Sequence, residues 1–356
     1  MSESTRTVTP NALIKAVKQA IKVKRPVMIY SAPGCGKSDI VHQIGRELGR
    51  PVIDIRLALY DPSDIKGFPY FDPKSESMKW APSSEFPKDE FSNAIIFLDE
   101  LVSAAPSTQA AAYQLVLNYR VGEYVLPKNC AIVAAGNRAS DRGVVYKMPM
   151  PLANRFIHLD LKVDVEEWVD WALNNNIHKD VVGYISHMKQ DLFSFDPKTS
   201  GHAFATPRTW QFTSQFLQDE DEMGEETVLD LISGTIGDGL ALKFNAYRKT
   251  SAKLPKAIDI LEGKVTSLKT KEIGALYSLV ISLSYELKEF HEKKVKNFWG
   301  YMDTAFEFCM NNLPAELNVM FSKTLMKNCG VPIEPDKMQK FDAYYKEYGK
   351  YIFANT

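Results

Sequence analysis

The chain has 356 residues, of which 45% are hydrophobic and 24% are charged, and this composition is typical of folded globular proteins. The formal net charge of −1 excludes a strongly basic surface of the kind that binds nucleic acids, except as a local patch. The longest apolar runs are too short to cross a bilayer, the N-terminal segment lacks the apolar core of a signal peptide, and the four cysteines lack metal-ligand spacing. We therefore expect a cytoplasmic protein with reduced thiols.

Strands alternate with helices in the first 163 residues. Apolar residues recur at helical spacing in 10–23, and the continuous apolar run 94–99 is typical of a strand that is buried on both faces. This alternation implies a mostly parallel sheet between helices, which is the α/β class. The predicted helices are 10–23, 38–48 and 107–119, and the predicted strands are 27–30, 51–59, 94–99, 129–137 and 156–161.

The pattern changes near residue 163, after which helical spacing dominates. We therefore expect an α/β core over 1–163 and a helical remainder. The last third carries no motif with an assigned chemistry. Its aromatic-rich end, 341–353, could contact a neighbouring molecule, although such a stripe more often packs on its own domain. The predicted helices of this part are 165–173, 180–188, 208–217 and 271–290.

A glycine-rich loop, Ser-Ala-Pro-Gly-Cys-Gly-Lys-Ser over 31–38, connects the strand 27–30 to the next helix. Gly34 and Gly36 allow backbone N–H groups to approach phosphate oxygens, and the helix N-terminus adds positive partial charge. Lys37 can reach the terminal phosphates of a nucleotide, and the Ser38 hydroxyl can bind Mg²⁺. The alternative is a glycine-rich turn that caps an ordinary helix.

Ser31 and Cys35 are the two unusual residues of this loop. The usual pattern has glycine where this chain has Ser31, and because serine is small we expect a modest effect. Cys35 could act as a redox switch, but a tolerated side chain at a variable position is the simpler interpretation.

An acidic pair ends the apolar strand 94–99. Asp99 and Glu100 follow five apolar residues, and the end of a parallel strand faces the crevice where ligands bind. Asp99 would help to hold Mg²⁺, and Glu100 would orient and polarise the attacking water. Such pairs also occur by chance at strand ends. Together with the loop about 60 residues upstream, however, the pair predicts nucleotide hydrolysis.

Several motifs occur in an order that resembles the AAA+ ATPases of the MoxR-like, dynein-related type. They are APGCGKS, IIFLDELVSAAPSTQAAAYQLVLNYRVGEYVLP, IVAAGNR, MPLANRFIHL and ATPRTW, and the resemblance covers residues 10 to about 215. It implies an AAA+ core over 1–163 and a helical lid over 164–250. Beyond the lid, helical patterns alone predict a C-terminal helical extension over 251–356. It also implies ATP and Mg²⁺ as ligands, a homo-oligomer that is most simply a hexamer, and a separate von Willebrand factor A domain protein as a partner.

The resemblance also assigns roles to three polar residues. Asn137 matches sensor 1, Arg155 matches the arginine finger that reaches a neighbouring subunit, and Arg208 matches the lid arginine called sensor 2. The alternatives are an asparagine that caps a turn, a surface ion pair and an ordinary helix surface. Pro207 suits a first helical turn. The expected nucleotide-binding residues are Pro33, Gly34, Cys35, Gly36, Lys37, Ser38, Asp39 and Asp99; the expected metal ligands are Ser38 and Asp99; and the expected catalytic residues are Glu100, Asn137, Arg155 and Arg208.

Two hairpins are expected to project from the core. One lies in 118–129 with Gly122 at its turn, and the other lies in 61–82, at the place of an insert in the family resembled. The second carries an aromatic set that could hold a partner or could pack on the core. This set is Phe68, Tyr70, Phe71 and Trp80.

These features predict an Mg²⁺- and ATP-dependent ring motor that remodels a client protein. One rival is a nucleic-acid motor of the same fold, which the near-zero net charge disfavours. The other rival is a nucleotide-gated scaffold with little turnover, which the intact Glu100 disfavours. Both rivals remain open at this point.

Overall fold

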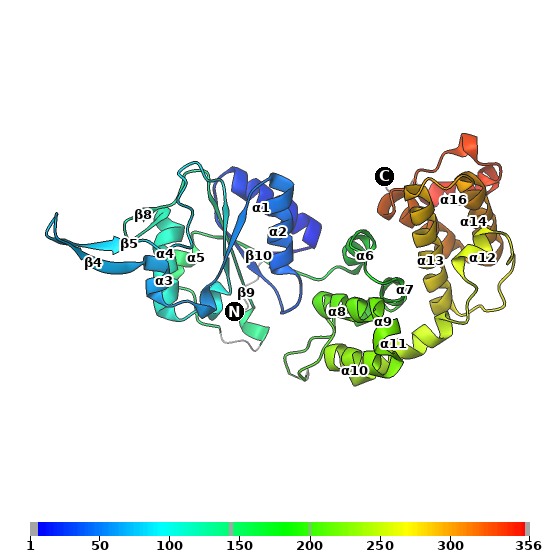
Figure 1. Cartoon of the computed structure of the whole chain (residues 1–356), viewed down its shortest axis with the longest axis horizontal. Coiled ribbons are helices and arrows are strands. Elements are labelled where there is room, and N and C mark those ends of the chain that lie inside the picture. Colours follow the sequence, from blue (N-terminus) through cyan, green and yellow to red (C-terminus); the bar gives the residue numbers. More distant parts are fainter. Residues whose placement is uncertain (1–5, 142–144, 199–200, 353–356) are drawn as a thin grey trace. The chain divides into compact units, whose positions relative to one another are not determined.

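The computed structural model describes residues 6–141, 145–198 and 201–352. The chain divides into two compact units. The first comprises Met1–Asp164 and Phe195–Thr199, and the second comprises Val165–Ser194 and Ser200–Thr356. Each unit is described by itself (Figure 1).

The described part of the first unit contains a parallel sheet of six strands in the order β1-β10-β2-β9-β6-β3. The α/β class predicted from the sequence is therefore confirmed. One strand prediction was too long, because 51–59 continues as a strand only to Arg56 and then forms a 3-10 turn over Leu57–Leu59. The strands are β1 (Thr7–Val8), β2 (Val27–Tyr30), β3 (Val52–Arg56), β6 (Ile95–Asp99), β9 (Ala131–Gly136) and β10 (Ile157–Leu161).

Helices cover both faces of this sheet. Successive strand residues point to opposite faces, and because both sets are apolar, each face is buried against helices. In β2 and β6, Ile29 and Phe97 join the core beneath α1 (Pro10–Lys22) and α2 (Lys37–Leu48). Their neighbours Met28 and Leu98 join the second core, beneath α4 (Pro106–Asn118). The two cores hold the strands from both sides, so the strand ends are fixed in position. The short helices of this unit are α3 (Pro62–Lys66) and α5 (Met150–Ala153).

Two antiparallel hairpins accompany the sheet, as predicted. They are β4 (Phe68–Asp72) with β5 (Ser77–Ala81), and β7 (Arg120–Val121) with β8 (Tyr124–Val125). Figure 1 shows β4 and β5 extending away from the sheet. The Trp80 ring lies against the turn at Gly122, so the base of the longer hairpin packs on the shorter one.

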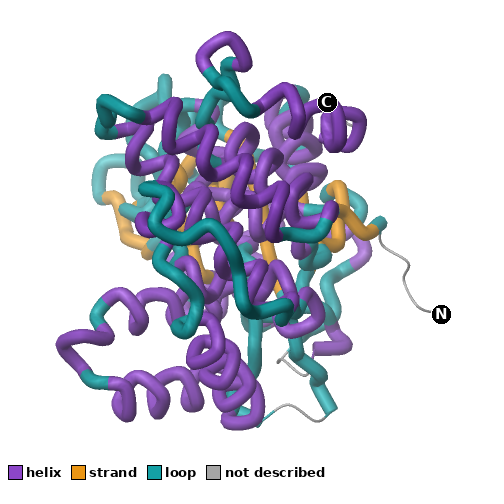
Figure 2. The backbone as a smooth tube through the Cα atoms, turned by 90° about the vertical axis from the view of Figure 1, so that its right-hand side faces the viewer, coloured by secondary structure: helices purple, strands orange, loops and turns teal. Residues whose placement is uncertain are grey.

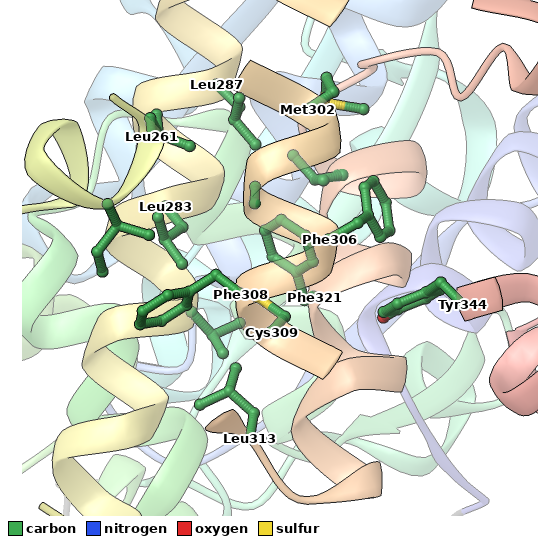
Figure 3. Close-up of a cluster of buried hydrophobic side chains, with 14 of the residues drawn as sticks. Leu261, Leu283, Leu287, Met302, Phe306, Phe308, Cys309, Leu313, Phe321 and Tyr344 are labelled. Carbon is green, nitrogen blue, oxygen red and sulfur yellow. The ribbon is translucent and has the colours of Figure 1, made fainter. Parts of the chain in front are cut away.

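The second unit consists of helices and loops in its described residues (Figure 2). Its largest core gathers around α13 (Ile273–Glu292) and α14 (Phe298–Asn312), where the Phe306 ring meets Phe321 and Tyr344 edge-on (Figure 3). Tyr344 is fully buried, so the aromatic stripe at the end of the chain packs largely on its own unit, and residue 353 lies outside the described residues. The division of this part into 164–250 and 251–356 remains a prediction.

The helices of the second unit are α6 (Val165–Asn174), α7 (Lys179–His187), α8 (Pro207–Gln218), α9 (Glu220–Met223), α10 (Glu225–Ile236), α11 (Asp238–Ser251), α12 (Ala257–Leu261), α13 (Ile273–Glu292), α14 (Phe298–Asn312), α15 (Ala315–Lys323) and α16 (Phe341–Ile352). Throughout the described residues, every helix is too short or too polar to span a membrane.

Candidate nucleotide-binding site

The loop between β2 and α2 has the backbone of a phosphate cradle. Gly34 and Gly36 have φ angles of 74° and 84°, in the left-handed region that favours glycine. Gly36 directly precedes the first residue of α2, so the first N–H groups of that helix face outward without helical partners. A Cβ atom at Gly36 would find its nearest neighbour only at 4.0 Å, at the Asp39 carboxylate. The space in front of this backbone is therefore open to a ligand.

Lys37 lies between the loop and the end of β9. Its Nζ atom donates hydrogen bonds to Ser31 Oγ at 3.0 Å and to Asn137 Oδ1 at 3.0 Å. Longer contacts at 3.3 and 3.4 Å reach the carbonyl oxygens of Ser31 and Ala32. Two residues that the sequence analysis assigned to one site, Lys37 and Asn137, are thus in direct contact although they are 100 positions apart.

Asp99 is buried at the end of β6 and uses both of its carboxylate oxygens. Ser38 Oγ donates to Oδ2 at 3.0 Å, and the Glu100 backbone N–H donates to Oδ1 at 2.9 Å. Glu100 itself has a φ of 56°, which is uncommon for a residue with a side chain. Local strain of this kind often occurs where a side chain must be aimed for function.

A third carboxylate, that of Asp54 on β3, adds negative charge near this position. Burial raises the pKa of Asp54, the nearby Asp99 raises it further, and His42 opposes the shift from 3.6 Å. Asp54 was not among the residues predicted from the sequence, because local patterns do not reveal that β3 lies beside β6.

Two further residues lie beside these groups. Ser31, for which the sequence predicts a modest effect, is fully buried, and its hydroxyl contacts the Lys37 ammonium. Gly136 ends β9 directly before Asn137, and a Cβ atom there would lie 2.4 Å from Val102 Cγ2. A larger residue at 136 would therefore displace the strand end that carries Asn137.

The arginines of the first unit lie in different environments. Arg138 is bound within the unit, through its Nε atom to Asp160 at 2.7 Å and through Nη2 to the Leu161 carbonyl at 2.9 Å. Arg155 is exposed in the turn between α5 and β10, and its guanidinium has no hydrogen bond or ion pair to any described residue. Arg155 precedes β10, whereas the glycine-rich loop follows β2, and these two strands are parallel neighbours.

The remaining predicted residues have these positions. Arg208 is exposed in the first turn of α8 in the second unit, after Pro207, whose place in a first turn is confirmed. Burial raises the pKa of the Cys35 thiol, and the protonated thiol is the unreactive form. Pro33 lies within the loop, where its carbonyl is 3.9 Å from Cys35 Sγ, and Asp39 lies in the first turn of α2.

These donors suit a nucleoside triphosphate with Mg²⁺. Mg²⁺ in phosphate sites keeps several waters and binds few carboxylates, rather than a full protein cage. Within the described residues, no cluster of three or more histidine, cysteine or acidic side chains could hold a metal ion. One hydroxyl, one buried carboxylate, one ammonium and a glycine-lined backbone are the groups that such a ligand requires.

Part of the first unit resembles a known protein family. The model of the ATPase family associated with various cellular activities (AAA) matches residues 27–158. Midasin of Giardia intestinalis is 26% identical over 178 residues, which are 48% of this chain. The matched region spans only 4% of midasin.

Similarity to solved structures is more distant. One mutant of Thermotoga maritima RuvB is 17% identical with a TM-score of 0.39, and the match covers 76% of this chain and 78% of that one. A second RuvB mutant is 17% identical with a TM-score of 0.37, with coverage of 77% and 79%. Similarity at this level does not extend to function. The family match and the geometry of the loop lead to one conclusion: residues 27–158 are similar to the AAA family, and the chain is an ATPase.

Proposed function

We propose that this chain is an Mg²⁺-dependent ATPase of the MoxR-like type, which hydrolyses ATP at the interfaces of a homo-oligomeric ring. The observation that carries the proposal is the position of Arg155. Asp160 pairs with Tyr30 in the parallel sheet, so Arg155 lies five residues before the level of the loop. β10 begins at Ile157, which pairs with Val27, so the strand accounts for three of these residues, or about 10 Å, before the turn that carries Arg155. An exposed arginine at the opposite end of the strands is badly placed for the nucleotide bound by the same chain. It is well placed for a nucleotide bound by a second copy.

Each residue of the site has a role in this proposal. Lys37 would bind the terminal phosphates, and Ser38 and Asp99 would hold Mg²⁺, which supplies charge neutralisation when bound. Glu100 would orient and polarise the attacking water, and Asn137 would position the same water. These five side chains bind and orient the nucleotide and the water. The negative charge that develops as the phosphoryl group is transferred still needs a further cation beside it.

Arg155 of a second copy would supply that cation, and Arg208 would report the nucleotide state to the lid. AAA ATPases typically oligomerise. We propose a hexamer, because a ring lets every Arg155 reach a neighbouring site. Hydrolysis then requires assembly, which couples turnover to the state of the ring.

The client of the motor would be a protein, bound by the β4–β5 hairpin. Phe68 and Phe71 are 65% and 59% exposed, and Tyr70 and Met78 are exposed beside them. Exposed aromatic side chains of this kind are typical of interaction surfaces. Trp80 is the exception in the predicted set, because it is half-buried at the base of the hairpin. A separate von Willebrand factor A domain protein would be the partner that presents the client.

The test is a mixture of two inactive variants. Arg155→Ala keeps the ATP site but removes the cation, and Lys37→Ala removes phosphate binding but keeps Arg155. Each variant alone should hydrolyse ATP at least a hundredfold more slowly than the unmodified protein. An equimolar mixture should recover activity at least tenfold above either variant, because some interfaces then combine an intact site with an intact arginine.

A mixture that stays as inactive as its components would reject the shared site, as would full turnover by Arg155→Ala alone. The rate per chain of the unmodified protein should also fall on dilution. Stimulation of turnover by single- or double-stranded DNA that falls steeply with salt would instead indicate a nucleic-acid motor.

A further inference from the structure

We propose that Ser31 is a positioning residue, which holds the Lys37 ammonium over the glycine-rich loop before the nucleotide binds. This inference rests on the proposed function, because Ser31 acts only through a lysine that binds phosphate. The usual motif has glycine at this position, and glycine has no side chain with which to bind an ammonium. The device is therefore a property of this chain rather than of the motif.

The hydroxyl of Ser31 is fully engaged. Its Oγ atom donates to the Ala32 carbonyl at 2.8 Å and accepts from Lys37 Nζ at 3.0 Å. Because the donated hydrogen bond fixes the direction of the O–H group, a lone pair of Oγ remains directed at the ammonium. The side chain is fully buried, so bulk water does not compete for this contact.

The backbone at Ser31 shows that the position does not require glycine. Ser31 does not have a positive φ angle, whereas Glu100 does. The Ser31 N–H also donates to the Gly136 carbonyl at 3.4 Å, next to Asn137. Ser31 therefore contacts the lysine without local strain and lies at the strand end that carries the second partner of Lys37.

The contact with Ser31 limits the conformational freedom of the Lys37 side chain. A lysine side chain has more rotamer freedom than most, and binding a phosphate removes it. An ammonium that is already held by Ser31 Oγ and Asn137 Oδ1 loses less freedom on binding. In this proposal the contact persists through the reaction, so its loss should affect ATP binding more than the chemical step.

The experiment compares Ser31→Ala and Ser31→Gly with a matched control, Ser284→Ala. Ser284 is also fully buried, and its Oγ also donates to a backbone carbonyl at 2.8 Å, but it lies on α13 of the second unit. Calorimetry should show a three- to tenfold weaker Kd for ATP in both Ser31 variants, with kcat within twofold of the unmodified protein. Ser284→Ala should leave the Kd unchanged.

A second readout uses the protein without nucleotide. Acetylation by a water-soluble ester, followed by mass spectrometry of the peptide that contains Lys37, should be at least threefold faster in both Ser31 variants. An exposed lysine such as Lys189 should react equally in all proteins.

The outcomes separate the two proposals. If the unmodified protein fails to bind ATP, the proposed function is wrong. If it binds ATP and Ser31→Ala binds equally well, only the role of Ser31 is wrong. The inference is also overturned if kcat falls as much as the affinity, or if the Ser31 variants lose much more thermal stability than Ser284→Ala, because Ser31 would then act on loop structure in general.

Discussion

Gly36→Ala separates the cost of backbone strain from the loss of phosphate binding. Gly36 has a φ of 84°, and an L-residue in the left-handed region costs about 1–2 kcal/mol. The new methyl group meets nothing closer than 4.0 Å, so no clash adds to this cost. For a unit of this size, 1 kcal/mol lowers Tm by about 2–4 °C, and we expect a loss of about 2–8 °C.

The expected effect on ATP binding is larger, because the added Cβ stands in the space that phosphate oxygens would occupy. Each hydrogen bond to a charged group contributes about 1.5–3 kcal/mol, and 1.4 kcal/mol corresponds to a factor of ten. Loss of one backbone contact should therefore weaken the Kd for ATP by about 10- to 150-fold. Calorimetry with ATP and Mg²⁺ measures this change, and thermal melting without nucleotide measures the strain.

Gly49→Ala provides the control at the other end of the same helix. Gly49 has a φ of 62°, and a Cβ atom there would meet nothing within 4 Å. The strain should therefore be similar while the ATP affinity stays unchanged. If Gly36→Ala and Gly49→Ala lose similar stability and both bind ATP as tightly as the unmodified protein, the loop is not the phosphate cradle.

Three further predictions follow from the two units. Glu100→Gln should lower the ATP turnover number by about 10²- to 10⁴-fold while the Kd for ATP stays within about threefold, and unchanged turnover would support a nucleotide-gated scaffold. Phe68→Ser combined with Phe71→Ser should change the free energy of unfolding by less than about 0.5 kcal/mol, because both rings are exposed, and a larger loss in a thermal melt would mean that they pack on the core. Burial lowers the pKa of His178 below its ordinary value, and its Nδ1 accepts the Asp180 N–H at 3.2 Å. The unfolded chain then binds the proton more readily than the folded one, so the second unit should lose stability as the pH falls below about 6.5, and His178→Asn should flatten that dependence in urea melts at several pH values. A steeper slope in the variant would contradict this assignment.

Local patterns in the sequence determined the elements and the loop. The segment from β2 through the glycine-rich loop into α2 is contiguous, so residue types alone indicate a strand, a glycine-rich loop and a helix start. Apolar runs also indicated buried strands, because a strand covered on both faces needs apolar residues at every position. The place where β3 ends was predicted wrongly, since the alternation of 51–59 does not distinguish a strand from the 3-10 turn that follows it.

Contacts between distant segments were decided only by the tertiary structure. Strand order is set by the packing of whole elements, and buried strands with similar apolar sequences carry no label for their neighbours. Ser38 meets Asp99 across 61 positions because β2 and β6 both flank β9, and Asp54 comes near Asp99 because β3 lies beside β6. Residue types along the chain indicated which groups could bind a nucleotide. The packing of the sheet decided which of these groups meet, because parallel strands bring all their carboxyl ends to one side. Arg155 precedes β10, so it lies at the other end of the strands.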